Sequence, residues 1–429
     1  MNKFIILFLI PFFTINGQET ETVPRYSIME LVELGLDKSL DIKAGQKEAE
    51  SWQYRVKEAS RPENPSVSLY GGSKDVKSSG SVLPSTGGLA YVEGGSSSGA
   101  TFGVTVTQPL RLYGKRKDEK KQAELNRKLA GLDIEQRKLL VKFEIITLAY
   151  RLKVAEEQIV HAREEQERMK LLLEFISTKP KASPVIRLDY DTVKNHKTLL
   201  DRRLELMALE TVNIWNELNL YLHMNDKPDL DIPWFTDGAE IDVAALIDGV
   251  ENSITVRKNL AVLEKMSIAE KIARKKKYPD ISVFAQYSRE NAGSETEQIV
   301  NFGVNIPLPV FKSGHNEAEA VHSRMAAEKI RQEFAMQKVR MTVEKTYNRY
   351  EAVRKVMKKL PVSGIEQLHH NLDFAETEFR RGRITLEKFL GYIEQAHEMH
   401  SYIINTQMDY LVAYIDLLVI GSSGDFVIK

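Results

Sequence analysis

The stretch Phe102-Gly-Val-Thr-Val-Thr-Gln-Pro109 occurs a second time, 200 residues later, as Phe302-Gly-Val-Asn-Ile-Pro-Leu-Pro309. In both copies large apolar residues alternate with small or polar ones, which is the period-two pattern of a β-strand with one apolar face. Gly114 and Gly314 follow at the same offset. Because the strand pattern, a proline and a glycine recur in the same order, we interpret the two stretches as equivalent parts of a tandem repeat.

A second set of matches, at an offset of 214 residues, extends the repeat toward the N-terminus. Asn64-Pro-Ser-Val-Ser68 aligns with Tyr278-Pro-Asp-Ile-Ser282, and Ser39 aligns with Ser253. The offset changes once, within the Gly/Ser-rich stretch 71–100. Each copy therefore predicts a helical segment, a strand, a polar loop, a second strand and a long helix. The helical segments are expected at 28–61 and 243–277, and the strands at 66–70, 101–107, 281–287 and 301–306.

The helices that follow the strands are very long. Between Lys115 and Ser177 the sequence has no proline and a single glycine, which predicts about 95 Å of helix at 1.5 Å per residue. A matching segment runs from Asn316 to Arg381, with Pro361 and Gly364 as interruptions. After a turn, each continues in a further helix, at 185–222 and 386–419. Helical hairpins of this length exceed a compact core and need lateral neighbours.

Composition and the N-terminus narrow the protein class. Residues 1–17 have the basic start and short apolar run of a secretory signal peptide. The chain has no cysteine, and its 60 acidic residues balance 60 basic ones. These facts exclude disulfides and an N-terminal lipid on cysteine, and they predict no nucleic-acid partner. No later stretch approaches eighteen consecutive apolar residues, so strands would have to form any membrane-spanning part.

The expected fold is mainly α-helical with a transmembrane β-barrel to which each protomer contributes four strands. Four strands cannot close a barrel, because bacterial barrels begin at about eight; three copies would supply twelve. The predicted domains are a first repeat at 18–225, a linker at 226–242 and a second repeat at 243–429. Their β-hairpins are expected at 65–108 and 279–307, and their long helical hairpins at 114–222 and 316–419.

Five segments together resemble the outer-membrane efflux protein family, the TolC-like channels. They are 64–69, 108–116, 278–282, 306–311 and the second helical turn at 379–385. The resemblance covers nearly the whole mature chain. It implies a homotrimer with a twelve-stranded barrel in outer-membrane lipid and a helical tube in the periplasm. It also implies docking to a periplasmic adaptor, the membrane fusion protein, and through it to an inner-membrane pump of the RND type.

The resemblance suggests where partners and cargo meet the chain. The helical tips would dock the adaptor through Ser183, Pro184, Val185, Ile186, Gly382, Arg383, Ile384 and Thr385, although any helical hairpin needs Gly or Pro to turn. Candidate aperture charges are Asp189, Asp191, Glu387 and Lys388. Lys388 and Gly391 stand where related channels can carry acidic residues, and a solvated helix face is the alternative.

Two basic clusters flank the predicted strand pairs. As a hypothesis, they contact anionic lipid headgroups, while solvated helix ends are the equal alternative. Their members are Lys115, Arg116, Lys117, Arg274, Lys275, Lys276 and Lys277.

Four histidines near the second tip are candidate metal ligands. His397 and His400 share a helix face, and His369 and His370 precede the tip. No third ligand is evident nearby, so we predict no metal site. The sequence also has no nucleophile elbow, phosphate-binding glycine loop or HExxH motif, which predicts neither an enzyme nor a cofactor.

The function that these expectations favour is an outer-membrane channel in a tripartite efflux system. Pro307-Leu-Pro-Val-Phe311 is most similar to the branch that exports heavy-metal cations. Drug efflux and type I protein secretion are alternatives with the same architecture. A periplasmic helical adaptor or scaffold without a pore is the alternative from another class.

Overall fold

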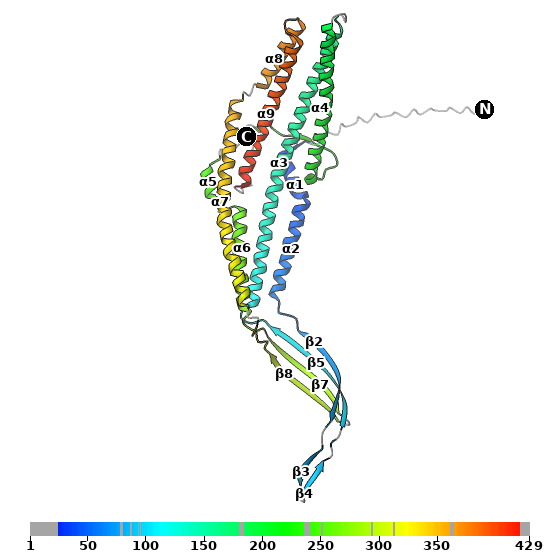
Figure 1. Cartoon of the computed structure of the whole chain (residues 1–429), viewed down its shortest axis with the longest axis vertical. Helices are drawn as coiled ribbons and strands as arrows, with labels where there is room; N and C mark the ends of the chain where they lie inside the picture. The colour runs from blue at the N-terminus through cyan, green and yellow to red at the C-terminus, as the bar shows by residue number, and fades with distance from the viewer. Residues whose placement is uncertain are drawn as a thin grey trace, which may run out of the picture. The chain divides into compact units, whose positions relative to one another are not determined.

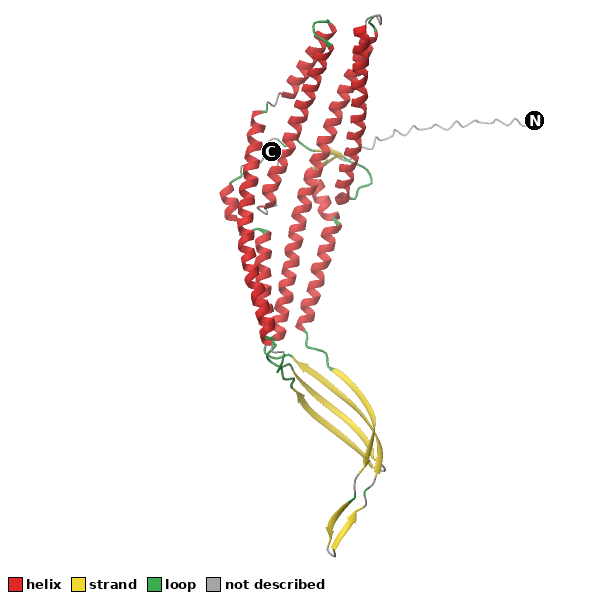
Figure 2. Cartoon of the chain, viewed as in Figure 1, coloured by secondary structure: helices red, strands yellow, loops and turns green. Residues whose placement is uncertain are grey.

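A computed structural model describes residues 25–420 except 78–79, 86–87, 93, 95, 180–183, 236–240, 250–251, 293–294, 312–313 and 361–363. The expected signal peptide at 1–17 lies outside these residues. Helices make up most of the described chain (Figures 1 and 2). They are α1 (Ile28–Lys38), α2 (Leu40–Ser60), α3 (Lys115–Ser177), α4 (Pro184–Leu222), α5 (Val243–Gly249), α6 (Ile254–Lys275), α7 (His315–Lys359), α8 (Gly364–Arg380) and α9 (Leu386–Ile420).

The chain forms two compact units, and each draws on both predicted repeats. The first, here called the tip unit, consists of Met1–Lys38, Glu144–Trp234 and Ile365–Met408. The second, here called the sheet unit, consists of Ser39–Phe143, Phe235–Gly364 and Asp409–Lys429. Two of the boundaries between the units fall inside α3 and α9, so these two helices contribute to both.

The sheet unit contains a four-stranded antiparallel sheet in the order β2-β5-β7-β8. Its strands are β2 (Ser66–Lys77), β5 (Ser96–Leu110), β7 (Ile281–Ala292) and β8 (Glu295–Asn305). A strand is found at each of the four predicted places, and every one extends at least five residues beyond a predicted end. Strand β3 (Ser81–Ser85) pairs with β4 (Gly88–Val92) inside the stretch that the sequence predicts as a polar loop.

Equivalent residues of the two repeats start helices in the same way. Ser39 and Ser253 are both buried N-caps, and each hydroxyl accepts a hydrogen bond from the amide three residues later. These bonds satisfy amides that the first helical turn leaves unpaired. The cap at Ser39 also explains why the predicted helix 28–61 is two helices, α1 and α2. Gly114 and Gly314 have φ of 69° and 76°, left-handed values that glycine adopts without strain, directly before α3 and α7.

The tip unit is built from α1, α4, α8 and the adjoining parts of α3 and α9. One apolar cluster packs within it, with side chains from α3, α4, α8 and α9, and Phe389 and Val193 in this cluster are fully buried. A short parallel pair, β1 (Arg25–Ser27) and β6 (Asp229–Asp231), also belongs to this unit. The sequence predicts only a linker around β6, because three residues are too few to show a period.

One described helix, α9, is long and apolar enough by composition to cross a membrane, with a mean hydropathy of 1.3 over its most apolar window. Within that window 56% of the residues are buried inside the protein. The C-terminal half of α9 carries fully buried side chains such as Tyr410 and Leu411, as in the core helix of a folded protein.

Candidate functional site

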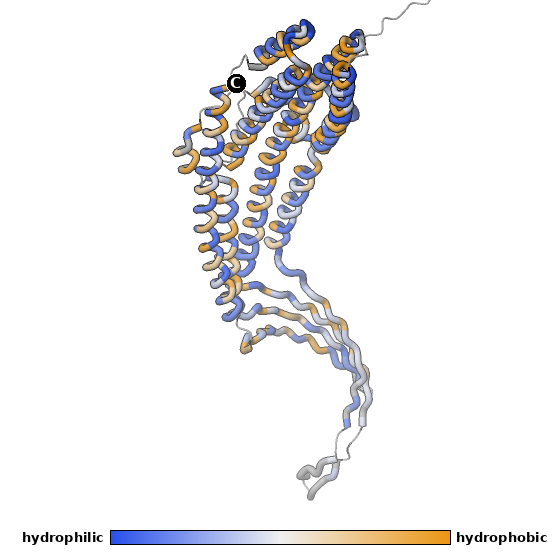
Figure 3. Tube along the Cα trace, turned by 45° about the horizontal axis from the view of Figure 1, so that its top comes forward, coloured by the Kyte–Doolittle hydropathy of each residue, from blue (hydrophilic) through white to orange (hydrophobic). Residues whose placement is uncertain are grey.

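One face of the sheet is apolar and exposed. Because directly paired residues of antiparallel strands share a face, the register defines rows across the sheet. Three rows lie on this face: Val67–Val106–Ala285–Phe302, Leu69–Val104–Tyr287–Val300 and Gln108–Val283–Val304. Phe302 is 79% exposed and Leu69 is 69% exposed. The alternation along each strand can be followed in Figure 3. An apolar surface of this extent indicates contact with lipid or another apolar partner.

The opposite face is mostly polar. Its rows are Ser66–Thr107–Phe284–Gly303, Ser68–Thr105–Gln286–Asn301 and Tyr70–Gly103–Ser288–Ile299. The Gln286 side chain donates a hydrogen bond to the Tyr70 hydroxyl and accepts one from the Asn301 amide. The sheet therefore separates an apolar side from a hydrogen-bonding side.

The two outer strands of the sheet have open edges. Among the described strands, β2 pairs only with β5, and β8 pairs only with β7. Each outer strand therefore presents a row of unpaired backbone donors and acceptors along its free side. Exposed edges of long, apolar strands are templates for pairing with another chain. The sheet therefore needs a further strand at each edge to pair these backbone groups.

The second helical tip is a tightly hydrogen-bonded turn. Gly382 has φ of 73°, its amide donates to the Phe379 carbonyl, and the amide of Arg383 donates to the Glu378 carbonyl, each at 2.9 Å. This pair of bonds is the Schellman motif, which requires a left-handed residue at the glycine position. Thr385 then caps α9 by accepting from the amide of Lys388. Arg383 is exposed and Ile384 is half-buried.

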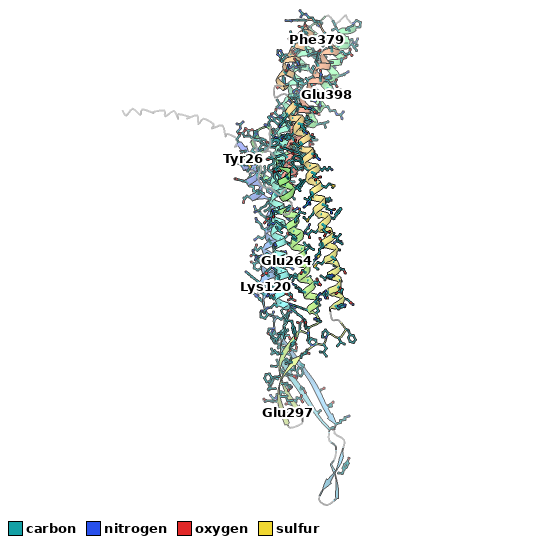
Figure 4. The ribbon with its side chains drawn as sticks, turned by 90° about the vertical axis from the view of Figure 1, so that its left-hand side faces the viewer. Tyr26, Lys120, Glu264, Glu297, Phe379 and Glu398 are labelled. Atoms are coloured by element: carbon teal, nitrogen blue, oxygen red, sulfur yellow. The ribbon has the colours of Figure 1, made fainter. Side chains whose placement is uncertain are left out.

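The first helical tip is described only in part. Ser183 lies outside the described residues, and α4 begins at Pro184. Val185 is 64% exposed, whereas Ile186 packs against the apolar cluster of the tip unit. Beneath the tips, Phe379 (labelled in Figure 4) stacks with Phe389 at 5.4 Å and meets Phe175 edge-on at 6.2 Å. These rings join the helical hairpin α3–α4 to the hairpin α8–α9.

A groove of about 490 Å³ lies beside the second tip, a feature that sequence reasoning did not predict. Its lining combines apolar and charged side chains, including Phe374, Tyr392, Glu378, Arg383 and Ile384. Phe374 is 64% exposed there. The groove therefore combines aromatic, aliphatic and charged side chains, as protein contact surfaces do.

The four candidate aperture charges lie near the starts of two helices. Asp189 is half-buried and Asp191 is exposed in the first turns of α4, while Glu387 and Lys388 are exposed in the first turn of α9. They lie near the two tips because α4 and α9 begin directly after these tips.

Most of the basic residues flanking the strands are engaged inside the sheet unit. Lys115 is buried and donates to Asp280 at 2.9 Å and to the Tyr278 carbonyl at 2.8 Å. Lys275 pairs with Asp118 at 2.6 Å, and Lys276 pairs with Glu317 at 2.7 Å. Arg274 contacts both Glu270 and Glu319. Lys277 lies over the Tyr278 ring, whereas Arg116 and Lys117 are exposed.

Apolar side chains on α4 form an exposed stripe. Leu188, Leu199, Leu206, Leu209 and Leu220 lie on one side of this helix, because their spacings of 11, 7, 3 and 11 residues are close to whole turns. All five are more than half exposed. On α7, Ile330, Phe334 and Met341 make a similar stripe. The length of the helices predicts that they pack against lateral neighbours. These exposed stripes are surfaces on which such packing can take place.

Comparison with known proteins agrees with this geometry. Residues 31–178 match the sequence profile of the family described as outer membrane efflux protein. The matched part is about a third of the 429-residue chain. This likeness supports a role as an outer-membrane efflux channel component.

Solved structures with similar folds are channels at low sequence identity. The Campylobacter jejuni CmeC outer membrane channel superposes with a TM-score of 0.70 at 14% identity, covering 93% of this chain and 86% of that one. CusC, described in terms of transmembrane channel formation, gives 0.70 at 13% identity, with 92% and 91% covered. The open Neisseria gonorrhoeae MtrE channel gives 0.67 at 12%, with 92% and 89% covered. No curated protein sequence matches this one significantly.

Proposed function

We propose that three copies of this chain form one efflux channel, with their sheets joined edge to edge in a twelve-stranded barrel. The observation that carries this proposal is the four-stranded sheet with an exposed apolar face and free edges at β2 and β8. Pairing β8 of one copy with β2 of the next satisfies both edges at once. A closed barrel has no edges, and closure is the condition for strands to cross lipid.

The two faces of the sheet give the barrel an inside and an outside. The rows that contain Leu69 and Phe302 face lipid, and the rows that contain Gln286 and Asn301 line an aqueous path. Among the basic residues, Arg116, Lys117 and Lys277 are the ones left for lipid headgroups, since the other four are paired within the chain.

The long helices build the periplasmic tube. The exposed stripe that contains Leu199 and Leu206 on α4 is buried against a neighbouring copy, and so is the stripe around Phe334 on α7. Burial of one leucine side chain contributes on the order of 1.5–3 kcal/mol, so these stripes favour the trimer over the monomer.

The helical tips bind a periplasmic adaptor, which connects the channel to an inner-membrane pump of the RND type. The groove lined by Phe374, Tyr392 and Arg383 adds a contact surface next to Gly382. Adaptor binding loosens the helices near the tips and widens the opening past Asp189, Asp191, Glu387 and Lys388, while the pump supplies the driving energy. We expect replacement of Gly382 by Val to abolish adaptor binding without preventing membrane insertion, because a β-branched residue strains a φ of 73°.

Heavy-metal cations are the proposed cargo. This part of the proposal rests only on the similarity of residues 307–311 to the branch of the family that exports such cations. Drugs and secreted proteins are the alternative cargoes. A deletion strain that becomes sensitive to metals but not to drugs would support heavy-metal cations. The decisive test of the channel itself is single-channel conductance of the purified protein in a planar bilayer. Stepwise currents are expected, whereas a water-soluble monomer that gives none would favour the adaptor or scaffold without a pore.

A further inference from the structure

Four histidines from three helices meet inside the tip unit. The ring of His161 on α3 stacks on His400 of α9 with a centroid distance of 4.0 Å. His397 of α9 lies 5.7 Å from His161, and His369 of α8 meets it edge-on at 6.0 Å. From the sequence, no third ligand was evident near His397 and His400; in the structure, the ring of His161 lies against both. His161 joins them although it lies 208 residues from His369 along the chain.

We propose that His161, Glu164 and His369 form a binding site for a divalent transition-metal ion of the Zn²⁺ class, linking α3 to α8. Each of the three offers a ligand atom, and these atoms lie within 4.8 Å of one another. Two imidazole nitrogens and one carboxylate oxygen are a ligand set that zinc uses in proteins, with a water in the fourth position. The proposal does not depend on which cargo the channel carries.

The fit of the ion follows from the positions of the three side chains. In tetrahedral zinc sites the ligand atoms are about 3.4 Å apart, given bonds of about 2.1 Å, so the set has to close by about 1.4 Å. Glu164 is more than half exposed and one helical turn from His161, so its carboxylate can swing inward. His369 is half-buried on the facing helix. Side-chain rotation alone can therefore supply the closure.

The imidazole of His161 is prepared for a ligand role. Its Nδ1 atom is buried and makes no hydrogen bond to any described residue. An unpaired buried nitrogen is costly, and a metal ion would satisfy it.

The space beside the cluster selects a small ligand. A cavity of about 10 Å³ is lined by His161, His369 and His400 together with Leu368, Leu372 and Ala396. That volume holds one water or one ion and excludes organic molecules. Behind the ligands, Glu165 lies between His397, at 3.7 Å, and His196, at 3.4 Å. These three residues are not assigned as ligands.

The metal would fasten the two helical hairpins of one chain to each other. His161 and Glu164 belong to the hairpin α3–α4, and His369 belongs to the hairpin α8–α9. A bound ion would therefore resist separation of α8 from α3 in the tip unit. Because the ion binds the folded arrangement only, it should raise the unfolding temperature as its concentration rises.

The test uses the full-length protein without an affinity tag, purified in detergent and treated with a chelator. Titration with Co²⁺ should give the visible absorption of a four- or five-coordinate ion, saturating at one ion per chain, and Zn²⁺ should displace it. His369→Gln and Glu164→Gln should each weaken Co²⁺ binding at least tenfold. His370→Gln is the matched control, since His370 is exposed on the same helix next to His369, and it should bind as the unaltered chain does.

Folding is checked in the same samples by the unfolding temperature without metal. If the His369→Gln variant is unstable, Glu164→Gln still tests the site. Glu164 is exposed, so its replacement should not affect folding. Absence of one-per-chain binding in the unaltered protein would overturn the proposal, as would equal affinities for His369→Gln and His370→Gln. Since no transport is measured, this outcome is independent of the conductance test of the channel.

Discussion

The ring of Tyr70 on β2 covers Gly103, the residue directly opposite it on β5. Phe284 on β7 covers Gly303 on β8 in the same way. In each case a Cβ built on the glycine would overlap the aromatic ring. An aromatic ring packed over a paired glycine thus occurs once in each repeat, on the mostly polar face of the sheet. The glycines are required there because the ring occupies the space of a side chain.

Replacement of Gly103 by Val should therefore destabilise the sheet. The valine side chain forces the Tyr70 ring out of its position, and overpacking of this kind costs about 1–3 kcal/mol. The measurement is the thermal unfolding of the purified protein, together with the heat-dependent change of its migration on gels. Adding Tyr70→Ala to Gly103→Val should restore part of the loss, because the smaller residue frees the space.

Gly72→Val is the matched control for that experiment. Gly72 lies in β2, the strand that carries Tyr70 and pairs with β5, and nothing is within 4 Å of a Cβ placed on it. It should change the unfolding temperature little. An equal loss for both variants would show that valine harms the strand wherever it is placed and that the contact between Tyr70 and Gly103 is not the cause.

The paired helix caps make a second prediction. Ser39→Ala and Ser253→Ala each remove the hydroxyl that accepts from the amide of Ile42 or Val256. Loss of such a cap costs about 1 kcal/mol. Urea unfolding should report similar losses for the two variants, since both serines are buried to the same extent. Ser51→Ala, at an exposed position within α2, should be neutral; a comparable loss there would rule out capping as the reason.

Local sequence patterns predicted most of the helices and strands, because each pattern occurs in both repeats. Proline, glycine and period-two alternation mark the ends of strands such as β5 and β8, and the absence of proline predicts the full length of α3. The hairpin β3–β4 was missed, since its Gly- and Ser-rich surroundings have no apolar period. The parallel pair β1–β6 was missed because it joins two three-residue segments that are far apart in the sequence.

The candidate sites were less predictable, because they depend on tertiary contacts. The position of Lys115 just after a strand suggested an exposed basic residue. In the structure its side chain is buried and pairs with Asp280. His369 and His400 gave no sign of a third histidine, because His161 reaches them from another helix. Spacing within one helix shows which residues share a face, but it does not show what the facing helix brings to that face.

A third prediction concerns the ion pairs between α3 and α8. Arg168 bonds Glu376 at 2.5 Å and Asp373 at 3.0 Å, and its side chain is only 19% exposed. Arg168→Met should destabilise the tip unit by about 1–3 kcal/mol, because the half-buried Glu376 would keep only Arg380 as a partner and Asp373 would lose its contact with Arg168. If the tips widen during transport, this variant should also raise single-channel conductance.

Lys170→Met supplies the comparison for Arg168→Met. Lys170 pairs with Glu167 on the same helix, and both side chains are more than half exposed. Pairs of this kind contribute about 0–1 kcal/mol. The two variants remove one positive charge each from α3, so a difference between them isolates the contact to α8. Equal unfolding energies would contradict the role assigned to Arg168.

The orientation of the sheet can be tested with two neighbouring residues of β8. Phe302 lies on the apolar face opposite Ala285, and Asn301 lies on the polar face opposite Gln286. Phe302→Arg places a charge toward lipid, which costs about 2–4 kcal/mol near the bilayer midplane and less near its surface. Asn301→Arg places the same charge in the aqueous path, where it should leave assembly intact and change ion selectivity. Membrane fractionation and bilayer recordings of the two variants provide the readouts. If the lipid-facing assignment is reversed, the defects will exchange places, with Asn301→Arg failing to insert and Phe302→Arg shifting selectivity.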